Sequence, residues 1–554
     1  MTIPEAALRT MARVRPLCTV GLVLGTLLFA FSLSPSLVPR PFAFQGVISG
    51  LSLTAGYAIG TALTALWHYL ELPWPRPRLA RYIRWAAATA CVVVVLAFTG
   101  QATEWQNAVR AQMALEPIST AQPLGIALLA VIVFAAALLL GRAFRRTLEF
   151  LSGRLQRYIP PRVAHVTGIV AAVALFWTVI DGVLFSLALR AADTSYQQVD
   201  ALIEDHHERP QQPERAGSPA SAIDWQELGR QGRSFVSGGP SAQDLAEWTE
   251  GDADAPVPIR IYVGLHAAET AEGRAELALD ELQRTGAFDR EVLILATPTG
   301  TGWIDPAAAD PVEYLHGGDI ATVTAQYSYL PSPLALMAEG DYGAEMARAL
   351  FEAVYGHWRE LPADERPELY LHGLSLGALN SDRSFDLFDI IQDPFQGALW
   401  SGPPFRSETW RRVTERREPG SPAWLPVFRD GEVVRFANQD TGLAEQGGDW
   451  GPFRIAYLQY ASDPITFFEP SIAYEEPDWM RAPRGPDVAP QLRWYPVVTM
   501  LQLAADMMAA DGAPPGYGHT YAVEDYLRAW YTLTEPEGWD DAELGRLEQH
   551  LAQE

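Results

Sequence analysis

The first third of the chain is dominated by apolar segments long enough to cross a membrane. There are five of them, at residues 17–34, 47–67, 85–100, 124–141 and 163–189. Each is close to the roughly 20 residues that a membrane-spanning helix needs. A cleaved signal peptide could imitate the first segment, but four more follow it. The sequence therefore predicts a five-span helical membrane domain over residues 1–190.

Arginine is distributed unevenly over the loops between these segments. Thirteen arginines lie in the N-terminal tail and in the loops after the second and fourth segments, whereas the two opposite loops contain only Arg40 and Arg110. Positively charged loops stay on the cytoplasmic side of a membrane. We therefore expect a cytoplasmic N-terminus. Five crossings would then leave everything after residue 190 on the outer side.

The charge of the chain changes sharply near residue 190. Residues 1–190 carry 16 arginines and 6 acidic residues, a net charge of +10, whereas residues 191–554 carry 25 arginines and 61 acidic residues, a net charge of −36. Phosphate contacts need clustered cations, so the acidic part argues against nucleic-acid binding. The chain has no lysine, which excludes a Schiff-base lysine and a Walker lysine. Its two cysteines, Cys18 and Cys91, lie in apolar segments, and no metal or other cofactor is predicted.

The acidic part alternates between strand-like and helix-like patterns after a polar connecting region at 191–255. Strands are expected at 259–263, 291–295, 369–371, 397–400 and 454–460, and helices at 270–284, 341–359, 376–392 and 495–510, with an irregular insertion at 402–450 and a last helix at 522–534. This alternation predicts an α/β domain over 256–554, with a mostly parallel sheet and helices on both faces. The functional site of such a sheet lies at the carboxyl ends of its strands.

One apolar run, Glu368–Leu379, ends in Gly-x-Ser-x-Gly and leads directly into a helix-forming stretch. A serine hydroxyl is a poor nucleophile, so it must stand clear of the backbone beside a base. Glycines at 373 and 377 would let the strand and helix close in on such a turn. The pattern predicts a strand, a sharp turn and a helix with Ser375 as the nucleophile. The alternative is a glycine-rich turn with a structural serine.

A nucleophilic serine needs a histidine base and an acid that orients it, in the chain order Ser, acid, His. His519 follows a glycine-rich loop and immediately precedes the last expected helix, whereas His550 lies in a polar tail. Asp463 comes directly off an apolar strand, so it is expected at the carboxyl edge of the sheet. Three rival acids lie further from a strand end, namely Asp440, Asp449 and Glu469. We therefore predict His519 as the base and Asp463 as the acid.

Two backbone N–H groups are needed to bind the oxyanion of an acyl-transfer intermediate. One should be that of Leu376, just after the nucleophile. The second should come from Thr297–Trp303, the loop after an earlier strand, with Thr299 or Gly300 as the donor. A phosphate cradle is the rival interpretation of this loop, but the chain lacks the lysine and the spacing for it.

Two further features bear on the substrate. Asp181 lies within the fifth apolar segment, where it either makes a polar contact to a headgroup or a neighbouring helix, or is protonated and bonded to backbone. The segment 303–340 is rich in aromatic and aliphatic residues, namely Trp303, Tyr314, Tyr327, Tyr329, Leu330, Leu334 and Met337. These side chains either form an apolar substrate pocket or fill the core.

Several motifs together resemble a family of bacterial integral-membrane alpha/beta-hydrolases. Besides the five apolar segments and the serine turn, they are Arg215–Pro219, Gly229–Arg233, Thr297–Trp303, Ser401–Phe405 and Tyr460–Pro464. The resemblance covers nearly the whole chain. It implies a serine-hydrolase fold joined to a multi-pass domain in the bacterial plasma membrane. It also implies that residues 215–240, which composition alone assigns to a connecting region, belong to the folded domain.

The leading hypothesis is a membrane-anchored serine hydrolase that cleaves an ester or related acyl bond of an apolar or lipid substrate. Its partners would be the lipid bilayer and a small ester or lipid, and not nucleic acid, while the oligomeric state stays open. The first alternative is an acyltransferase that uses a cell-envelope alcohol. The second is a non-catalytic membrane transport or scaffold protein with a hydrolase-like binding domain.

Overall fold

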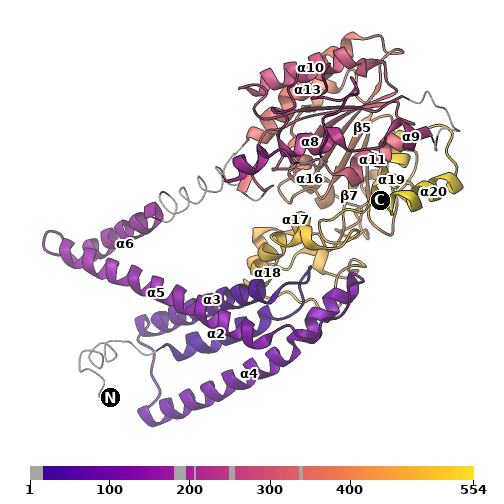
Figure 1. Ribbon diagram of the computed structural model, residues 1–554. Helices are drawn as coiled ribbons and strands as arrows, with labels where there is room; N and C mark the ends of the chain where they lie inside the picture. The colour runs from indigo at the N-terminus through magenta and orange to yellow at the C-terminus, as the bar shows by residue number, and fades with distance from the viewer. Residues whose placement is uncertain are drawn as a thin grey trace. The chain divides into compact units, whose positions relative to one another are not determined.

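The chain forms two compact units in the computed structural model (Figure 1). The structure describes residues 17–179, 182, 195–204, 207–246, 248, 256–332, 334–335 and 341–553. The first unit contains Met1–Thr178, Glu469–Met480 and Val488–Ala509, and the second contains Val179–Phe468, Arg481–Asp487 and Ala510–Glu554. Asp181 and Met337 lie outside the described residues.

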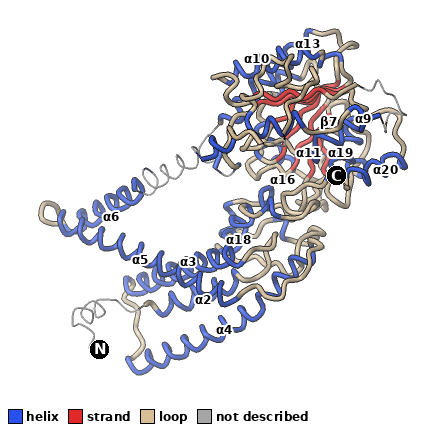
Figure 2. Tube along the Cα trace, viewed as in Figure 1, coloured by secondary structure: helices blue, strands red, loops and turns tan. Residues whose placement is uncertain are grey.

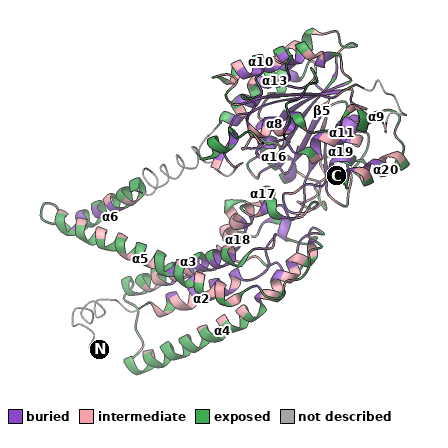
Figure 3. Cartoon of the chain, viewed as in Figure 1, coloured by how far each residue is buried: buried purple, intermediate pink, exposed green. Residues whose placement is uncertain are grey.

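The first unit is built on helices that coincide with the five apolar segments. They are α2 (Thr19–Ser32), α3 (Phe42–Tyr69), α4 (Pro77–Gln112), α5 (Pro123–Leu155) and α6 (Pro161–Trp177). Within the described residues, α3, α4 and α5 are long and apolar enough to cross a membrane, whereas α2 and α6 are apolar but have 14 and 17 residues. Figure 3 shows α4 and α5 largely exposed. Their exposed residues include Val92, Val93, Leu96 and Leu128, which suits a lipid-facing surface.

Helices α2 and α3 pack with their backbones in contact. A Cβ atom on Gly60 would lie 2.5 Å from the Cα of Gly21, and one on Gly56 would lie 2.7 Å from the Cα of Gly25. Small residues at this spacing allow close van der Waals packing, which is a main source of helix association in a membrane.

A C-terminal helix, α18 (Val498–Met507), belongs to this first unit and not to the α/β domain in which the sequence placed it. Asp506 accepts hydrogen bonds from the Ser36 hydroxyl and from Leu37 N, and its Oδ1 lies 2.8 Å from Arg40 Nε. The side chains of Arg40 and Asp506 are both fully buried. Gln502 adds hydrogen bonds to the carbonyls that follow α2. The first unit is therefore assembled from both ends of the chain.

The second unit contains a seven-stranded sheet in which every pairing is parallel (Figure 2). Its strands are β1 (Ile259–Val263), β2 (Val292–Thr297), β3 (Ile320–Ala325), β4 (Glu368–Leu374), β5 (Gly397–Ser401), β6 (Val434–Ala437) and β7 (Arg454–Leu458), in the order β1-β3-β2-β4-β5-β7-β6. Almost every strand residue is buried, as expected for a parallel sheet covered on both faces.

Helices cover both faces of this sheet. The helices of this unit are α8 (Gly229–Ser237), α9 (Ala242–Ala246), α10 (Ala271–Thr285), α11 (Pro306–Leu315), α13 (Tyr342–Glu360), α14 (Leu376–Asp382), α15 (Leu387–Ile390), α16 (Glu408–Glu415), α17 (Pro464–Phe467), α19 (Val523–Thr534) and α20 (Asp541–Leu551), of which α8, α10, α13, α14 and α19 pack directly on strands. Helices α10 and α13 pack together on one face, and α11 and α19 pack together on the other (Figure 2). The predicted α/β fold with a parallel sheet is confirmed.

Three local predictions were wrong, and one strand was missed. The insertion 402–450, predicted to be irregular, contains α16 and β6, and the segment 303–340 contains α11 and the strand β3, for which no prediction was made. Thr322 and Thr324 interrupt the apolar run of β3, and Arg435 interrupts that of β6, where the buried guanidinium donates to carbonyls such as that of Gly431. The single helix at 376–392 is two helices, because the Asp386 carboxylate caps a new helix by accepting Phe388 N. Helix 522–534 is followed by α20, which Asp540 caps.

Residues 215–240 pack on the sheet despite their polar composition. Arg260 N on β1 donates to Glu214 O at 3.2 Å, and Ala216 N donates to Arg260 O at 3.0 Å. The buried guanidinium of Arg215 donates to Gly238 O at 2.7 Å. This stretch therefore extends the sheet edge beside β1.

Candidate active site

Ser375 stands on a strained turn between β4 and α14. Its backbone has φ +55° and ψ −121°, a conformation that costs a non-glycine residue roughly 1–3 kcal/mol. A Cβ on Gly373 would lie 2.5 Å from the carbonyl carbon of Gly377, and a Cβ on Gly377 would clash with Thr297 O. Both glycines are therefore needed where strand, turn and helix crowd together, as the motif predicts.

The register of the sheet brings four strand ends to one edge. Thr297 at the end of β2 pairs with Gly373, Leu374 pairs with Ser401 at the end of β5, and Ser401 pairs with Leu458 at the end of β7. Ser375 N donates to Ser401 O at 2.9 Å, which ties the turn to the neighbouring strand. The loops that hold the predicted site residues therefore leave the sheet side by side.

Asp463 lies just beyond β7 and is fully buried. Its Oδ1 accepts Ile465 N at 2.8 Å and so caps α17. Its Oδ2 accepts hydrogen bonds from His519 Nδ1 at 2.7 Å, Tyr521 OH at 2.8 Å and Thr466 Oγ1 at 3.2 Å. These donors compensate for the loss of water around the carboxylate. The structure thus joins the predicted acid directly to the predicted base.

The ring of His519 is buried and oriented by this carboxylate. Burial alone would lower the pKa of His519, but the negative charge of Asp463 and its hydrogen bond outweigh that effect and raise the pKa above its ordinary value. With Nδ1 donating to Asp463, the other ring nitrogen becomes the acceptor in the neutral tautomer. That atom, Nε2, is buried and has no hydrogen-bond partner within the described residues.

The loop that contains His519 is fastened to the segment after β7 at three further points. Gly518 N donates to Ser462 Oγ at 2.8 Å, and Ala522 N donates to Tyr460 OH at 3.0 Å. The rings of Tyr460 and Tyr521 stack with their centroids 4.5 Å apart. Sequence reasoning missed these residues as supports of the site, although they flank Asp463 and His519 directly in the sequence.

Ser375 and His519 are linked through Ser401 and Gly402, and they form no direct hydrogen bond in the part of the chain that the structure describes. Gly402, the residue after Ser401, has φ +50°, and a Cβ there would lie 2.5 Å from His519 Cε1. The imidazole of His519 therefore lies against Gly402, and the preceding residue, Ser401, accepts the hydrogen bond from Ser375 N. Hydrogen bonds between nucleophile and base are often loose before a substrate binds.

The predicted oxyanion donors differ in how free they are. Leu376 is the first residue of α14, so its N–H has no acceptor within the helix. Thr299 N donates to Trp303 O at 3.0 Å, and Gly300 N donates to Ser332 Oγ at 3.3 Å. Either of these two groups would have to exchange its present partner for an oxyanion.

A second carboxyl group lies near His519. Asp305 is buried, its Oδ1 accepts Ala307 N at the start of α11, and its charge interacts with His519. Burial raises the pKa of Asp305 to about 7. Sequence reasoning did not single out this residue.

Two of the three rival acids have other surroundings. Glu469 belongs to the other compact unit, and the charge of Asp449 acts on Arg435. For Asp440, only a bond from its backbone N–H to Asn438 Oδ1 is seen among the described residues. The ring of His550, in the polar tail that follows α19, packs against Trp248 and Tyr314. No group of three or more His, Cys, Asp and Glu side chains suited to a metal ion occurs among the described residues.

Comparison with known families gives two matches. A model described as "Alpha/beta-hydrolase family" matches residues 259–547. A second, described as "Alpha/beta-hydrolase family N-terminus", matches residues 33–240. No curated protein matches the chain, and no solved structure does. The two matches span both compact units and agree with the resemblance seen in the sequence motifs.

Proposed function

The chain belongs to the alpha/beta-hydrolase family, and from this premise we propose that it is a membrane-associated serine hydrolase that cleaves an ester or related acyl bond. Ser375 is the nucleophile, His519 the base and Asp463 the group that orients the base. The observation that carries the proposal is the buried Asp463–His519 pair, with Nδ1 held at 2.7 Å and Nε2 unpartnered within the described residues.

In the first half of the reaction, Ser375 Oγ attacks the carbonyl carbon of the substrate while its proton passes to His519 Nε2. The resulting imidazolium is stabilised by Asp463, whose carboxylate stays ionised. The tetrahedral oxyanion is bound by Leu376 N–H and by a second donor from the Thr299–Gly300 turn. Collapse of this intermediate breaks the ester bond. His519 returns the proton to the leaving alcohol, and the acyl group remains on Ser375.

In the second half, His519 takes a proton from water, and the resulting nucleophile attacks the acyl carbon. The second tetrahedral intermediate releases the carboxylic acid and restores the Ser375 hydroxyl. An alcohol in place of water would give acyl transfer by the same steps. The same protein groups act in hydrolysis and in acyl transfer. Only the products distinguish the two reactions.

The acyl donor is an apolar or lipid ester that reaches the site from the bilayer or its surface. The described residues contain three helices long and apolar enough to cross a membrane, and this supports the proposal because one such helix would be enough for anchoring. The division of the chain supports it as well, since Glu469–Met480 and Val488–Ala509 belong to the same unit as these helices. Both segments lie between Asp463 and His519 in the sequence.

The test compares p-nitrophenyl esters of increasing acyl length, using the full-length protein in lipid nanodiscs and in detergent. We expect turnover that rises with acyl length, gains from lipid, and disappears in Ser375→Ala. Equal turnover of short and long esters without a gain from lipid would remove the membrane-delivery part of the proposal. The full chain is required, because α18 would lose its packing partners in a fragment that starts at residue 191.

The arginine distribution orients the protein with its N-terminus in the cytoplasm and its hydrolase unit outside. A reporter enzyme that is active only outside the cytoplasm should be active when fused after residue 554. The same reporter should be silent when placed near residue 150. The opposite pattern would reverse the proposed orientation.

A further inference from the structure

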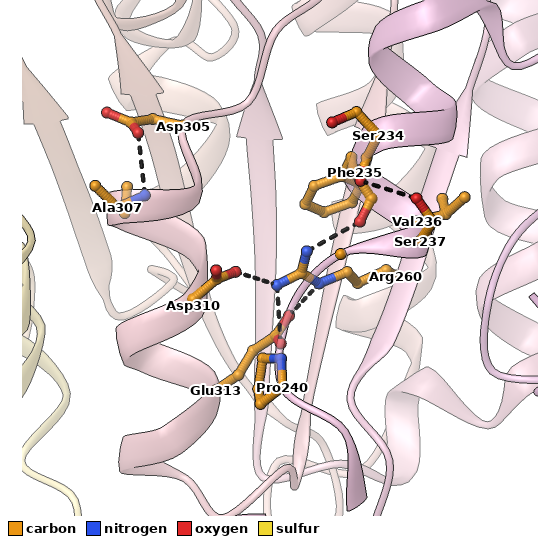
Figure 4. A network of polar contacts seen from close by, with 12 residues as sticks. Ser234, Phe235, Val236, Ser237, Pro240, Arg260, Asp305, Ala307, Asp310 and Glu313 are labelled. Atoms are coloured by element: carbon orange, nitrogen blue, oxygen red, sulfur yellow. Dashed lines mark hydrogen bonds and ion pairs between the residues drawn. The ribbon is translucent and has the colours of Figure 1, made fainter. Parts of the chain in front are cut away.

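A cavity of 340 Å³ lies in the second unit, and Ser375, Asp463 and His519 are not among the residues that line it. One wall is lined by Trp303, the last residue of the loop in which the oxyanion donors are predicted, and by Ile304, which follows it. Gln231 and Ser234 of α8 line another, and Arg260 of β1 and Asp310 of α11 complete it. In Figure 4, Ser234 and Asp310 come from different helices on either side of Arg260.

The charge of Arg260 is already neutralised within this wall. Its Nε lies 2.7 Å from Glu313 Oε1, its Nη2 lies 2.5 Å from Asp310 Oδ1, and its Nη1 donates to Phe235 O at 2.9 Å (Figure 4). These three partners fix the guanidinium in place, and Gly239 leaves room for it, because a Cβ at that position would clash with Nη2. Arg260 therefore forms a rigid floor and offers little net charge to a ligand.

The electrostatics of the cavity favour a neutral ligand. The carboxylates of Glu208 and Asp310 line it and would repel a phosphate or carboxylate. A ligand cation finds little to pair with, because Glu208 is solvent-exposed, one oxygen of Asp310 is already bound to Arg260, and the Arg260 guanidinium lies 4.8 Å from the ring of Phe235.

Uncommitted hydrogen-bonding groups surround the same space. The amide of Gln231, the hydroxyl of Ser234, Oδ2 of Asp310 and the indole N–H of Trp303 form no hydrogen bond with any described part of the chain. Together they offer both donors and acceptors. Trp303 is 36% exposed, so its ring also presents a flat apolar surface. A ligand that suits this set has several hydroxyl groups and a face of C–H bonds.

We propose that this cavity binds a neutral polyhydroxyl group, a glycerol or sugar moiety, which forms the alcohol part of the ester substrate. The inference rests on the proposed hydrolase function and adds the class of its leaving group. The cavity is connected to the reaction loop by hydrogen bonds. Thr299 N donates to Trp303 O, and Tyr262 OH donates to Gly302 O at 2.7 Å. The loop with the oxyanion donors and the cavity wall are thus one tightly bonded turn.

The kinetic test uses two esters with the same acyl chain, 6-O-octanoyl glucose and ethyl octanoate, with the full-length protein in nanodiscs. We expect the kcat/KM ratio of the glucose ester to the ethyl ester to fall about tenfold, or about 1.4 kcal/mol, in Trp303→Leu and in Gln231→Ala. Leucine keeps the backbone carbonyl that binds Thr299. Trp424→Leu is the matched control, because Trp424 lies outside the cavity, and its ratio should stay at the wild-type value. An unchanged ratio in both cavity variants would overturn the proposal.

A binding test separates this inference from the proposed function. Glycerol, glucose and mannose are each added to the full-length protein, and saturation-transfer NMR is recorded for the wild type and the three variants. The cavity is supported as a polyol site if saturation transfer to the polyol is seen with the wild type and Trp424→Leu but is lost with Trp303→Leu. This holds even if no ester is hydrolysed. If the protein hydrolyses esters but shows no saturation transfer to a polyol and no preference for the glucose ester, polyol binding in the cavity is refuted, whereas the proposed hydrolase function is retained.

Discussion

A fully buried carboxylate lies in each compact unit, Asp463 in the second and Asp506 in the first. Both accept hydrogen bonds from backbone and hydroxyl groups, but one is bound to an imidazole and the other to a guanidinium. Asp463 accepts a backbone N–H, two hydroxyl groups and an imidazole. Asp506 accepts a backbone N–H and a hydroxyl, and it pairs with Arg40. An imidazole can release its proton near neutral pH, whereas a guanidinium stays charged. We therefore propose that burial serves proton transfer by the Asp463–His519 pair in the second unit and assembly by the Arg40–Asp506 pair in the first.

The largest expected effect is the loss of turnover when the Asp463–His519 pair is changed. Asp463→Asn should lower kcat for ester hydrolysis about ten-thousand-fold, because the imidazole loses its orientation and the stabilisation of its charged form. His519→Gln should lower it at least as much. Asp440→Asn and His550→Gln are the matched controls and should stay near the wild-type rate. A larger loss in either control would move the assignment to that residue.

The Arg40–Asp506 pair should affect stability. Arg40→Ala leaves a buried carboxylate without its cation, so the free energy of unfolding should fall by about 3–5 kcal/mol. The measurement is a denaturant titration in detergent micelles. Arg145→Ala is the matched control, because the Arg145–Glu149 pair is solvent-exposed and contributes about 0–1 kcal/mol. Equal effects of the two variants would contradict the structural role of the buried pair.

The pH dependence of turnover should report His519. The base must be neutral to accept a proton, so kcat/KM should fall as the pH drops through a midpoint above 6.5, the ordinary pKa of histidine. The residual activity of Asp463→Asn should fall at a lower pH, because the carboxylate that raises the pKa is gone. Asp305, with a pKa of about 7, and Asp511 also act on His519. The variant Asp305→Asn tests whether this decrease of kcat/KM at low pH reflects the titration of His519 alone. If the midpoint of the decrease is the same in Asp463→Asn as in the wild type, the titrating group is not His519.

The smallest effect concerns Tyr521, which donates to Asp463 Oδ2 at 2.8 Å. Tyr521→Phe removes one hydrogen bond to a buried carboxylate, which corresponds to about 1.5–3 kcal/mol. We expect kcat/KM to fall about ten- to hundredfold, with its decrease at low pH still present. Tyr457→Phe is the control, since the buried Tyr457 hydroxyl has no partner in the described part of the chain. A loss in Tyr457→Phe as large as that in Tyr521→Phe would mean that repacking, and not the hydrogen bond, is being measured.

Much of the α/β fold could be predicted because most of its strands are recognisable from their residue types. The strands β1, β2, β4, β5 and β7 were expected within a few residues of their true ends, since buried parallel strands are continuous apolar runs. The strands β3 and β6 were missed because threonines and an arginine interrupt the run. Those side chains are tolerated only where the folded chain surrounds them.

In the candidate site, too, local features could be predicted from the sequence but contacts between distant residues could not. The serine turn is local, so its glycines and Ser375 could be recognised from spacing alone. The hydrogen bond of Tyr521 to Asp463 joins residues 58 positions apart, and that of Ser36 to Asp506 joins residues 470 positions apart. No local pattern encodes such partners. For this reason the sequence placed α18 in the α/β domain, although it belongs to the first unit.

The most direct test of the account is covalent labelling of Ser375. The full-length protein in nanodiscs is treated with a fluorophosphonate probe, digested and analysed by mass spectrometry. We predict a single adduct on the peptide that contains Ser375, slower labelling in His519→Gln, and no labelling in Ser375→Ala. A folded wild-type protein that stays unlabelled, or that is labelled equally in Ser375→Ala, would contradict the assignment of Ser375 as the nucleophile.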